Sequence, residues 1–267
     1  MKGPKISVIL SVYNGMPFLK YAVESILKQT YSNFEFIIVN DASNDGTLKY
    51  LKSLKDKRIK IITNQKNLGL AASLNKALSI AKGEYIARMD ADDISLPNRF
   101  KTQVEYLRAN PEVSLCGCWV DLIDKNGKVI GEKRYPANDL ELKNALKWYQ
   151  PIVHPTFMAT KKFYKSLNGY DTQFDYAEDY ELLSRAIKNN KFANIPSKLF
   201  LWRLANDRRS RRYMRNIDIA DYKVKLKILK ENYFGKLYIL YVFKKFITTF
   251  LIPIELKMFI AKKFKLA

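Results

Sequence analysis

Three carboxylates within four residues, in Asp90-Ala91-Asp92-Asp93, follow a predicted strand and are the strongest chemical signal in this sequence. Crowded carboxylates repel one another, so a site that keeps several of them ionised usually holds a cation. Oxygen ligands of this kind suit Mg²⁺ or Mn²⁺ carrying a diphosphate, which supplies the remaining ligands. The alternative is a solvated acidic turn before the helix that begins near Pro97, because short acidic motifs recur by chance.

A further acid, Asp41, stands at the end of another predicted strand, in a polar loop that runs to Gly46. An ionised carboxylate only accepts hydrogen bonds, so Asp41 could accept the ring N–H of a pyrimidine base. Tyr13 and Asn14, after the first strand, could offer a ring and backbone groups to the same base. The alternative for Asp41 is an Asx turn that caps the following helix.

Glu178 and Asp179 open a predicted helix over 180–188 and are candidates for a general base. The alternative is that these acids only complement the dipole of the helix. His154 is the single histidine, and a lone histidine is more often structural than catalytic. With one histidine and no nucleophile-elbow pattern, the sequence gives no context for serine or Cys–His catalysis.

Alternating strands and helices position these candidates. Strands are predicted over 6–12, 34–39, 59–63 and 84–89, and helices begin at residues 17, 47 and 70. Four β-α units of this spacing favour an α/β fold, in which a parallel sheet carries helices on both faces. In such sheets ligands collect at the carboxyl ends of the strands, where the polar loops of this sequence fall.

From residue 112 the pattern changes. Segments 112–124 and 128–133 flank Lys125-Asn126-Gly127, which predicts a hairpin. A helix over 139–148, a strand over 152–159 and the helix over 180–188 complete a mixed region. Cys116 and Cys118 are expected to be small buried core residues of a protein in a reducing compartment.

The order and spacing of these segments resemble those of family 2 glycosyltransferases, inverting enzymes with the GT-A fold. The resemblance runs from about Lys5 to Arg203. It rests on Ser11-Val12-Tyr13-Asn14, Gln29-Thr30-Tyr31, Val39-Asn40-Asp41-Ala42-Ser43-Asn44-Asp45-Gly46-Thr47, Asn67-Leu68-Gly69-Leu70-Ala71, Ala87-Arg88-Met89-Asp90-Ala91-Asp92-Asp93 and Glu178-Asp179. It implies a mostly parallel, Rossmann-like sheet flanked by helices over 1–207, with a nucleotide-binding half (about 1–110) and an acceptor half (about 111–207).

The resemblance also implies a role for each matching position. Asp41 would bind the nucleotide base, and Asp90 and Asp92 would hold a metal, Asp92 on the diphosphate. Asp179 would be the catalytic base, with Glu178 beside it. The nucleotide-sugar site would further include Val12, Tyr13, Asn14, Asn67, Lys76, Arg88 and Ala91, and the acceptor side would include His154 and Asp171.

The activity implied is inverting transfer of a hexose or N-acetylhexosamine from a UDP-sugar to a hydroxyl of a glycan or lipid-linked acceptor. The cofactor would be Mn²⁺ or Mg²⁺, and the setting the synthesis of a bacterial surface polysaccharide. The sequence departs from the family at Arg203-Leu204-Ala205, where many relatives carry an Arg-x-His segment that closes over the diphosphate. Either Arg203 acts there with arginines at 208, 209, 211 and 212, or that role is absent.

The net charge of +21 is unevenly distributed: residues 208–267 hold 16 Lys and Arg against 4 Asp and Glu, which is +12. A basic segment of this kind suggests a polyanionic partner, either nucleic acid or an anionic membrane. Its aromatic side chains alternate with lysines, so 208–267 is predicted to be an amphipathic helical extension that lies in lipid headgroups. The alternative is helices that pack on the catalytic domain and expose a basic face.

No signal peptide is recognised, and the apolar stretches 237–243 and 246–253 are separated by Lys244-Lys245, so no spanning helix is expected. The expected location is the cytoplasm, at the inner face of the plasma membrane. Nucleic acid is not an expected partner, since no nucleic-acid motif is found. Two other classes stay open: a sugar nucleotidyltransferase, although residues 12–17 lack a basic Gly-rich loop, and a basic non-catalytic binding protein.

Overall fold

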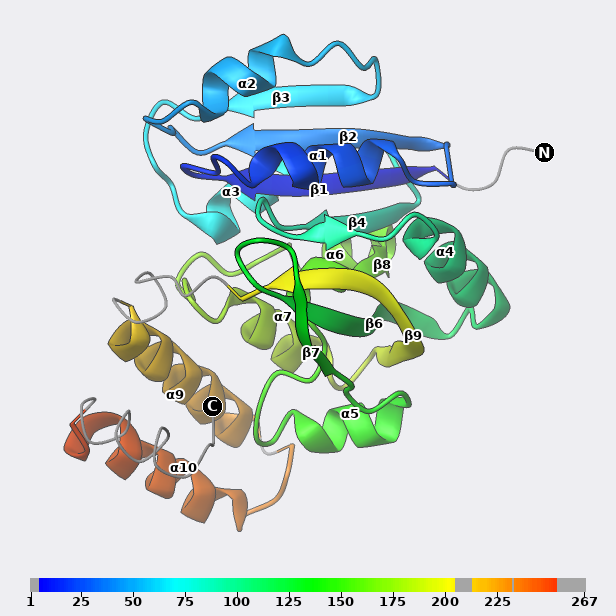
Figure 1. The fold of residues 1–267 in the computed structure, drawn as a ribbon. Helices are drawn as coiled ribbons and strands as arrows, with labels where there is room; N and C mark the ends of the chain where they lie inside the picture. Colours follow the sequence, from blue (N-terminus) through cyan, green and yellow to red (C-terminus); the bar gives the residue numbers. More distant parts are fainter. Residues whose placement is uncertain (1–4, 205–212, 232, 254–267) are drawn as a thin grey trace.

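The computed structural model describes residues 5–204, 213–231 and 233–253. In the first half of the chain, strands and helices alternate as predicted (Figure 1). The elements are β1 (Ile6–Val12), α1 (Leu19–Leu27), β2 (Phe34–Asn40), α2 (Thr47–Ser53), β3 (Ile59–Thr63), α3 (Leu70–Ile80) and β4 (Tyr85–Met89). Their strands are all parallel, in the order β3-β2-β1-β4. The apolar runs of β1 and β2 are buried on both faces, as inner parallel strands require.

The second half extends the same sheet with strands in both directions. It contains β5 (Ile94–Ser95), α4 (Arg99–Ala109), β6 (Val113–Ile123), β7 (Val129–Lys133), α5 (Asp139–Ala145), η1 (His154–Thr156), β8 (Met158–Thr160), α6 (Lys161–Ser166), α7 (Glu178–Ala186) and β9 (Lys191–Arg203). The full order is β3-β2-β1-β4-β8-β6-β9-β5, with β7 paired to β6 in the predicted hairpin. Beyond β4 the sheet is mixed, because β8 is antiparallel to both β4 and β6, whereas β6 and β9 pair in parallel.

The predicted strand over 152–159 is largely wrong. Residues His154–Thr156 form a 3₁₀ turn, and the strand begins only at Met158. Pro155 has no N–H to offer a neighbouring strand, and the Thr156 hydroxyl donates to the Val153 carbonyl oxygen at 2.6 Å, which stabilises the turn. The helix predicted over 139–148 ends earlier, at Ala145.

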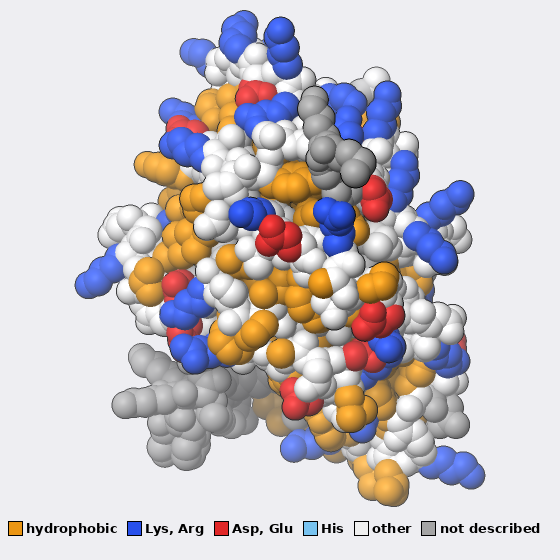
Figure 2. Space-filling model, turned by 90° about the vertical axis from the view of Figure 1, so that its right-hand side faces the viewer, with side chains coloured by type: hydrophobic (Ala, Val, Ile, Leu, Met, Phe, Trp, Pro, Cys, Tyr) orange, Lys and Arg blue, Asp and Glu red, His pale blue; other side chains and the backbone are white. Residues whose placement is uncertain are grey.

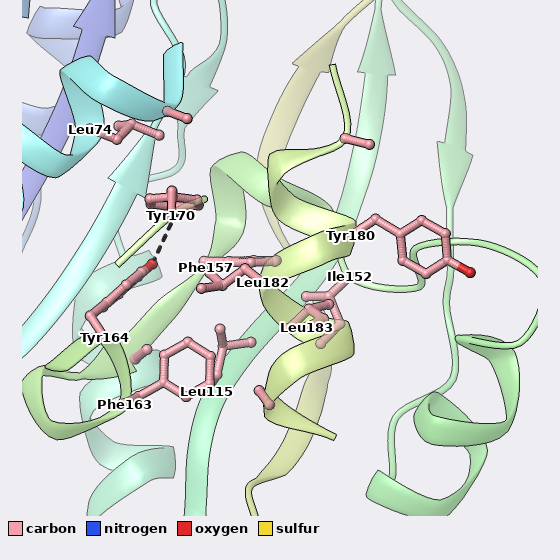
Figure 3. Close-up of a cluster of buried hydrophobic side chains, with 14 of the residues drawn as sticks. Leu74, Leu115, Ile152, Phe157, Phe163, Tyr164, Tyr170, Tyr180, Leu182 and Leu183 are labelled. Carbon is pink, nitrogen blue, oxygen red and sulfur yellow. Dashed lines mark hydrogen bonds between the residues drawn. The ribbon is translucent and has the colours of Figure 1, made fainter. Parts of the chain in front are cut away.

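Side chains alternate between the two faces of the sheet and form a hydrophobic core on each. On β1, Val8 and Leu10 join the core under α1 and α4, whereas Ile9 joins the core under α3 and α7. Figure 3 shows part of the second core. Cys116 and Cys118 are buried in the first core, as predicted, and burial raises the pKa of the Cys118 thiol to about 11.

Two further helices, α9 (Met214–Lys230) and α10 (Tyr238–Phe246), form the described part of the predicted extension. A single π-helical segment, Ile247–Leu251, continues α10. Their inner side chains belong to the same core as α7; these are Ala220, Val224, Ile228, Tyr238 and Val242. In Figure 1 both helices lie at the lower left, on the side of the sheet toward which β1, β2 and β3 run. The predicted boundary at 207/208 lies outside the described residues.

Surface charge and helix hydropathy bear on whether the protein could bind nucleic acid or cross a membrane. Figure 2 shows the right-hand side of Figure 1, where lysine and arginine side chains are scattered and acidic side chains lie among them. Among the described residues of this face, acidic side chains thus interrupt the basic ones, unlike the continuous basic groove that tracks a nucleic-acid backbone. Among the helices of the described residues, none is long and apolar enough to cross a membrane.

Candidate active site

The loops that follow β1 and β2 are joined at the carboxyl edge of the sheet. The Asp41 N–H donates to the Val12 carbonyl oxygen at 2.8 Å. The Asn14 N–H donates to the Ser43 hydroxyl at 3.0 Å, and the Asn14 side chain accepts from the Asn44 N–H at 2.9 Å. Asn14 has φ of +54°, a left-handed conformation that asparagine tolerates. The structure thus brings the predicted Val12, Tyr13 and Asn14 beside Asp41.

Asp41 is almost fully buried and its carboxylate is largely occupied. One oxygen accepts from the Asn64 amide at 2.7 Å and the Leu68 N–H at 2.8 Å, and the other accepts from the Gly69 N–H at 2.9 Å. A carboxylate has about four acceptor positions, so about one is left for a further donor such as the ring N–H of a base. Asp41 therefore also shapes the loop 64–69.

Asn64 is a member of this group that the sequence reasoning missed. Its amide also donates to the Ser73 hydroxyl at 2.9 Å, and its oxygen accepts from the Lys76 ammonium at 2.8 Å. Lys76 is therefore placed with Asp41 rather than with the acidic cluster. The exposed Asn67 accepts from the Gly69 N–H at 3.2 Å. The available signal for Asn64 is its position directly after β3, which matches that of Asp41 after β2.

Asp90, Asp92 and Asp93 converge directly after β4, with one carboxylate oxygen of each within 4.8 Å of the others. Burial, reinforced by the neighbouring Asp90, raises the pKa of Asp92 to about 6. Burial together with both neighbours raises the pKa of Asp93 well above its usual range, and one of its oxygens is buried without a hydrogen-bond partner. This all-oxygen, mutually repelling group fits a divalent cation such as Mg²⁺ or Mn²⁺. Asp93 was part of the motif but was not assigned a role from the sequence.

Two buried arginines, Arg88 and Arg203, contact the acidic segment 90–93. The fully buried Arg88 forms an ion pair with Asp90, so it supports that carboxylate rather than facing solvent. Arg203 donates from its guanidinium to the carbonyl oxygens of Asp92 at 2.7 Å and Asp124 at 2.8 Å, and its N–H donates to Asp93 at 2.7 Å. Arg203 therefore fixes the acidic segment, and the arginines at 208–212 lie outside the described residues.

Glu178 and Asp179 form the first turn of α7, and His154 lies against them. His154 Nδ1 lies 3.5 Å from a Glu178 carboxylate oxygen, and its Nε2 lies 2.9 Å from the Tyr170 hydroxyl. Burial and the nearby Arg88 lower the pKa of His154 to about 3, so the ring is neutral at physiological pH. Burial raises the pKa of Asp179, an effect that His154 opposes. A carboxylate with a raised pKa and limited exposure is suited to take a proton.

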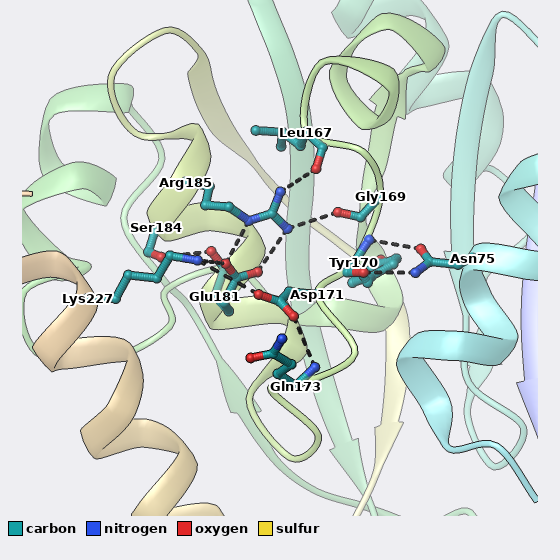
Figure 4. Close-up of polar contacts among 10 residues, drawn as sticks. All are labelled: Asn75, Leu167, Gly169, Tyr170, Asp171, Gln173, Glu181, Ser184, Arg185 and Lys227. Atoms are coloured by element: carbon teal, nitrogen blue, oxygen red, sulfur yellow. Dashed lines mark hydrogen bonds and ion pairs between the residues drawn. The ribbon is translucent and has the colours of Figure 1, made fainter.

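The loop before α7 connects the site to other parts of the molecule. Asp171, predicted on the acceptor side, faces α9, where its carboxylate lies 3.9 Å from the Lys227 ammonium (Figure 4). Asp175 packs so closely on Gly69 that a Cβ there would lie 2.9 Å from a carboxylate oxygen, and Gly69 has φ of +86°. Tyr176, with φ of +76°, exposes its ring beside Tyr213. No local pattern in the sequence indicated the last two contacts.

The fold and this site match known glycosyltransferases. The family model described as glycosyl transferase family 2 matches residues 7–167. The O-antigen biosynthesis glycosyltransferase WbnJ of Escherichia coli is 33% identical over 90% of this chain and 95% of its own length. The UDP-Glc:alpha-D-GlcNAc-diphosphoundecaprenol beta-1,3-glucosyltransferase WfgD of Escherichia coli is 31% identical over 71% of this chain and 72% of its own. This chain belongs to glycosyl transferase family 2 and is a glycosyltransferase.

Solved structures show the same GT-A fold. TarS of S. aureus in complex with UDP-GlcNAc superposes with a TM-score of 0.65 over 86% of this chain and 73% of the TarS chain, at 18% identity. The mannosyltransferase PcManGT of Pyrobaculum calidifontis, in complex with GDP-Man and Mn²⁺, has a TM-score of 0.65 over 92% of this chain and 70% of its own, at 21% identity. The family and fold expected from the sequence are therefore confirmed.

Proposed function

We propose that this chain is an inverting, metal-dependent transferase that moves a hexose or N-acetylhexosamine from a UDP-sugar to a hydroxyl of a glycan acceptor. The observation that carries the proposal is the joint placement of three groups. They are Asp41 with its remaining acceptor position, the cluster of Asp90, Asp92 and Asp93, and the acids Glu178 and Asp179 at the start of α7, of which Glu178 is buried and Asp179 is partly exposed.

Asp90 and Asp92 would hold Mn²⁺ or Mg²⁺, which when bound neutralises the charge that develops on the departing diphosphate. The proton transfer falls to a residue of the chain itself. Asp179 takes the proton from the acceptor hydroxyl, whose oxygen forms a bond to the anomeric carbon. The bond from that carbon to the diphosphate oxygen breaks, and the nucleoside diphosphate leaves with the electron pair. Attack opposite the leaving group converts an α-linked donor into a β-glycoside.

The choice of a uracil nucleotide rests on Asp41, since a carboxylate can accept the N3–H of uracil. The TarS structure holds UDP-GlcNAc and WfgD is named for UDP-Glc, whereas PcManGT holds GDP-Man. We also propose a lipid-linked acceptor in bacterial surface-polysaccharide synthesis, on the cytoplasmic side of a membrane. The support is that WbnJ is named for O-antigen biosynthesis and that WfgD is named for a diphosphoundecaprenol acceptor.

Calorimetric titration with UDP, GDP, CDP and dTDP, with and without Mn²⁺, tests the donor site. We expect Mn²⁺-dependent binding of UDP that weakens at least about tenfold in Asp92→Ala. Asp56→Ala is the matched control, because Asp56 pairs with Arg58 at 2.7 Å in a distant surface turn. UDP binding that Asp92→Ala leaves unchanged would contradict the assignment of the acidic cluster.

The base is tested separately from the donor site. With UDP-sugar and an acceptor glycan, Asp179→Asn is expected to lower kcat by about 10²–10⁴-fold while UDP binding stays near wild type. Glu178→Gln, which removes the carboxylate beside His154 Nδ1, should lower kcat less. An NMR spectrum of the product is expected to show the β-anomer; an α-linked product would refute direct displacement.

A further inference from the structure

Helix α10 is apolar on both sides, and only one side is covered. Tyr238 and Val242 are buried against the core, and the Tyr238 and Tyr241 hydroxyls donate to the carbonyl oxygens of Lys147 and Trp148 at 3.1 and 3.3 Å. These contacts fix which side of the helix faces outward. An amphipathic surface helix would be polar on that outward side.

The outward side of α10 and its π-helical continuation is instead a row of large apolar side chains. Leu237 is 80% exposed, Leu240 66%, Phe243 62% and Leu251 65%. Ile239, at 56% exposed, belongs to the same row. Phe246 and Phe250 are less exposed, because their rings pack on Tyr222 of α9 at centroid distances of 5.8 and 5.3 Å. We call Leu237, Ile239, Leu240, Phe243 and Leu251 the outer face of α10. Several large apolar side chains exposed together on one helix indicate an interaction site.

The charges around the outer face are positive. The acids of α9 and of the turn after it are neutralised within the structure: Asp221 pairs with Lys225 and Lys245, Asp218 also pairs with Lys245, and Glu231 pairs with Lys188. Lys236 and Lys244 are exposed among the side chains of the outer face, with Lys244 one helical turn after Leu240, and neither forms an ion pair within the described ranges. The segment 254–267 that follows adds four lysines and one glutamate to the sequence.

We propose that the outer face of α10 docks on a lipid bilayer that contains anionic headgroups. Leucine and phenylalanine side chains would enter the boundary between headgroups and acyl chains, while Lys236 and Lys244 contact the phosphates. A second copy of the chain is disfavoured, because a two-fold interface through this face would bring the lysines of both copies together. Since α10 lies on the side toward which β1–β3 run, docking would present the active site to an acceptor in the same membrane.

The inference rests on the proposed function for the role of membrane docking, but vesicle binding can be measured without transferase activity. The full chain is sedimented with vesicles of phosphatidylcholine alone and of phosphatidylcholine with about one third phosphatidylglycerol, without donor or acceptor. We expect binding to the anionic vesicles that decreases with salt. Leu240→Glu combined with Phe243→Glu should lower the partition coefficient by at least about tenfold, because two apolar anchors become anionic.

The control is Val129→Glu combined with Ile130→Glu, which changes two exposed apolar side chains of β7 in the same way and should bind like wild type. Far-ultraviolet circular dichroism shows whether each variant is folded. Absence of wild-type binding, or equal binding by the α10 variant, would overturn the proposal. So would a dimer in sedimentation velocity that the α10 variant dissociates. None of these results affects transfer to a soluble acceptor, so the two proposals fail separately.

Discussion

At the scale of single residues, the Asp41 carboxylate holds the loop 64–69 and is also the proposed contact of the nucleotide base. Its two oxygens accept from three N–H groups, one from Asn64 and two from the backbone of the loop 64–69. An asparagine would turn one of these acceptors into a donor that faces a donor. The loop 64–69 would lose a hydrogen-bond acceptor, and so would the nucleotide base in the proposed site.

We therefore expect Asp41→Asn to lower the free energy of unfolding by about 1–3 kcal/mol, the usual effect of a buried donor left without an acceptor. UDP binding should weaken at the same time. Urea unfolding and calorimetry measure the two effects. A variant with wild-type stability would show that the loop 64–69 does not depend on this carboxylate.

Asp92, a proposed metal ligand, is also expected to affect the stability of the fold. Because its folded pKa is about 6, above the usual value near 3.8, the folded state binds a proton at Asp92 more tightly than the unfolded state does. This stabilisation is complete below about pH 3.8 and is lost as the pH rises through about 6. Ionised Asp92 thus opposes folding at neutral pH in the absence of metal.

Asp92→Asn should consequently be more stable than the wild type at pH 8 in EDTA, by about 1–3 kcal/mol. The difference should shrink toward zero as the pH is lowered to about 4. Urea unfolding at both pH values measures it. Because the variant lacks a proposed metal ligand, Mn²⁺ should stabilise the wild type more than the variant. Equal stability at pH 8 would mean that burial and the neighbouring Asp90 do not disfavour the ionised form of Asp92.

At the scale of elements, α7 carries the proposed base and is anchored by a buried charge. Glu181 is fully buried and accepts from Arg185 at 2.6 and 2.8 Å and from Lys227 of α9 at 2.6 Å. Arg185 also donates to the Gly169 carbonyl oxygen at 2.9 Å, and Asn75 of α3 holds the adjacent Tyr170 through its N–H and carbonyl oxygen, both at 2.8 Å (Figure 4). Tyr170 in turn contacts His154. Contacts from α9 and α3 are therefore connected, through Tyr170 and His154, to the first turn of α7 that carries the proposed base Asp179.

Glu181→Gln should lower the free energy of unfolding by about 2–4 kcal/mol, because two cations lose a buried partner. Glu24→Gln is the matched control: Glu24 pairs with Lys28 at the same helical spacing, at 3.2 Å, but in solvent. It should lower the free energy by only about 0.2–0.5 kcal/mol. Denaturant unfolding compares the two. Similar small effects would mean that the cluster around Glu181 does not anchor α7.

The sequence predicted the elements that depend on local patterns and missed those that depend on distant partners. The strands β1–β4 are short segments rich in apolar residues, the acids at 90–93 follow β4, and the acids at 178–179 open α7, so local sequence patterns could locate all of them. The two-residue β5 exists only because it pairs with β9, over a hundred residues later. Likewise, the partners of Asp41 and the contact of Asp175 with Gly69 come from tertiary packing, which no local pattern encodes.

At the scale of the whole molecule, the described helices after the predicted boundary at 207/208 share a hydrophobic core with the rest of the chain. Ala220, Val224, Ile228, Tyr238 and Val242 are at most 6% exposed and lie in the core that also contains α3 and α7. The basic composition describes the outer surface of this region, whereas its inner surface is part of the catalytic domain. The position where the chain becomes strongly basic is therefore not the position where the packed core ends.

A chain that ends at residue 207 should therefore fail to fold stably, whereas one that ends at residue 253 should keep the core. Removal of α9 and α10 exposes the apolar surface of α7 that they cover, and each large buried side chain contributes about 1.5–3 kcal/mol. Several such losses approach the about 5–15 kcal/mol of total stability typical of a protein. Size-exclusion chromatography and thermal circular dichroism distinguish the outcomes. A cooperative transition of the 1–207 chain at the wild-type temperature would mean instead that the core does not depend on these helices.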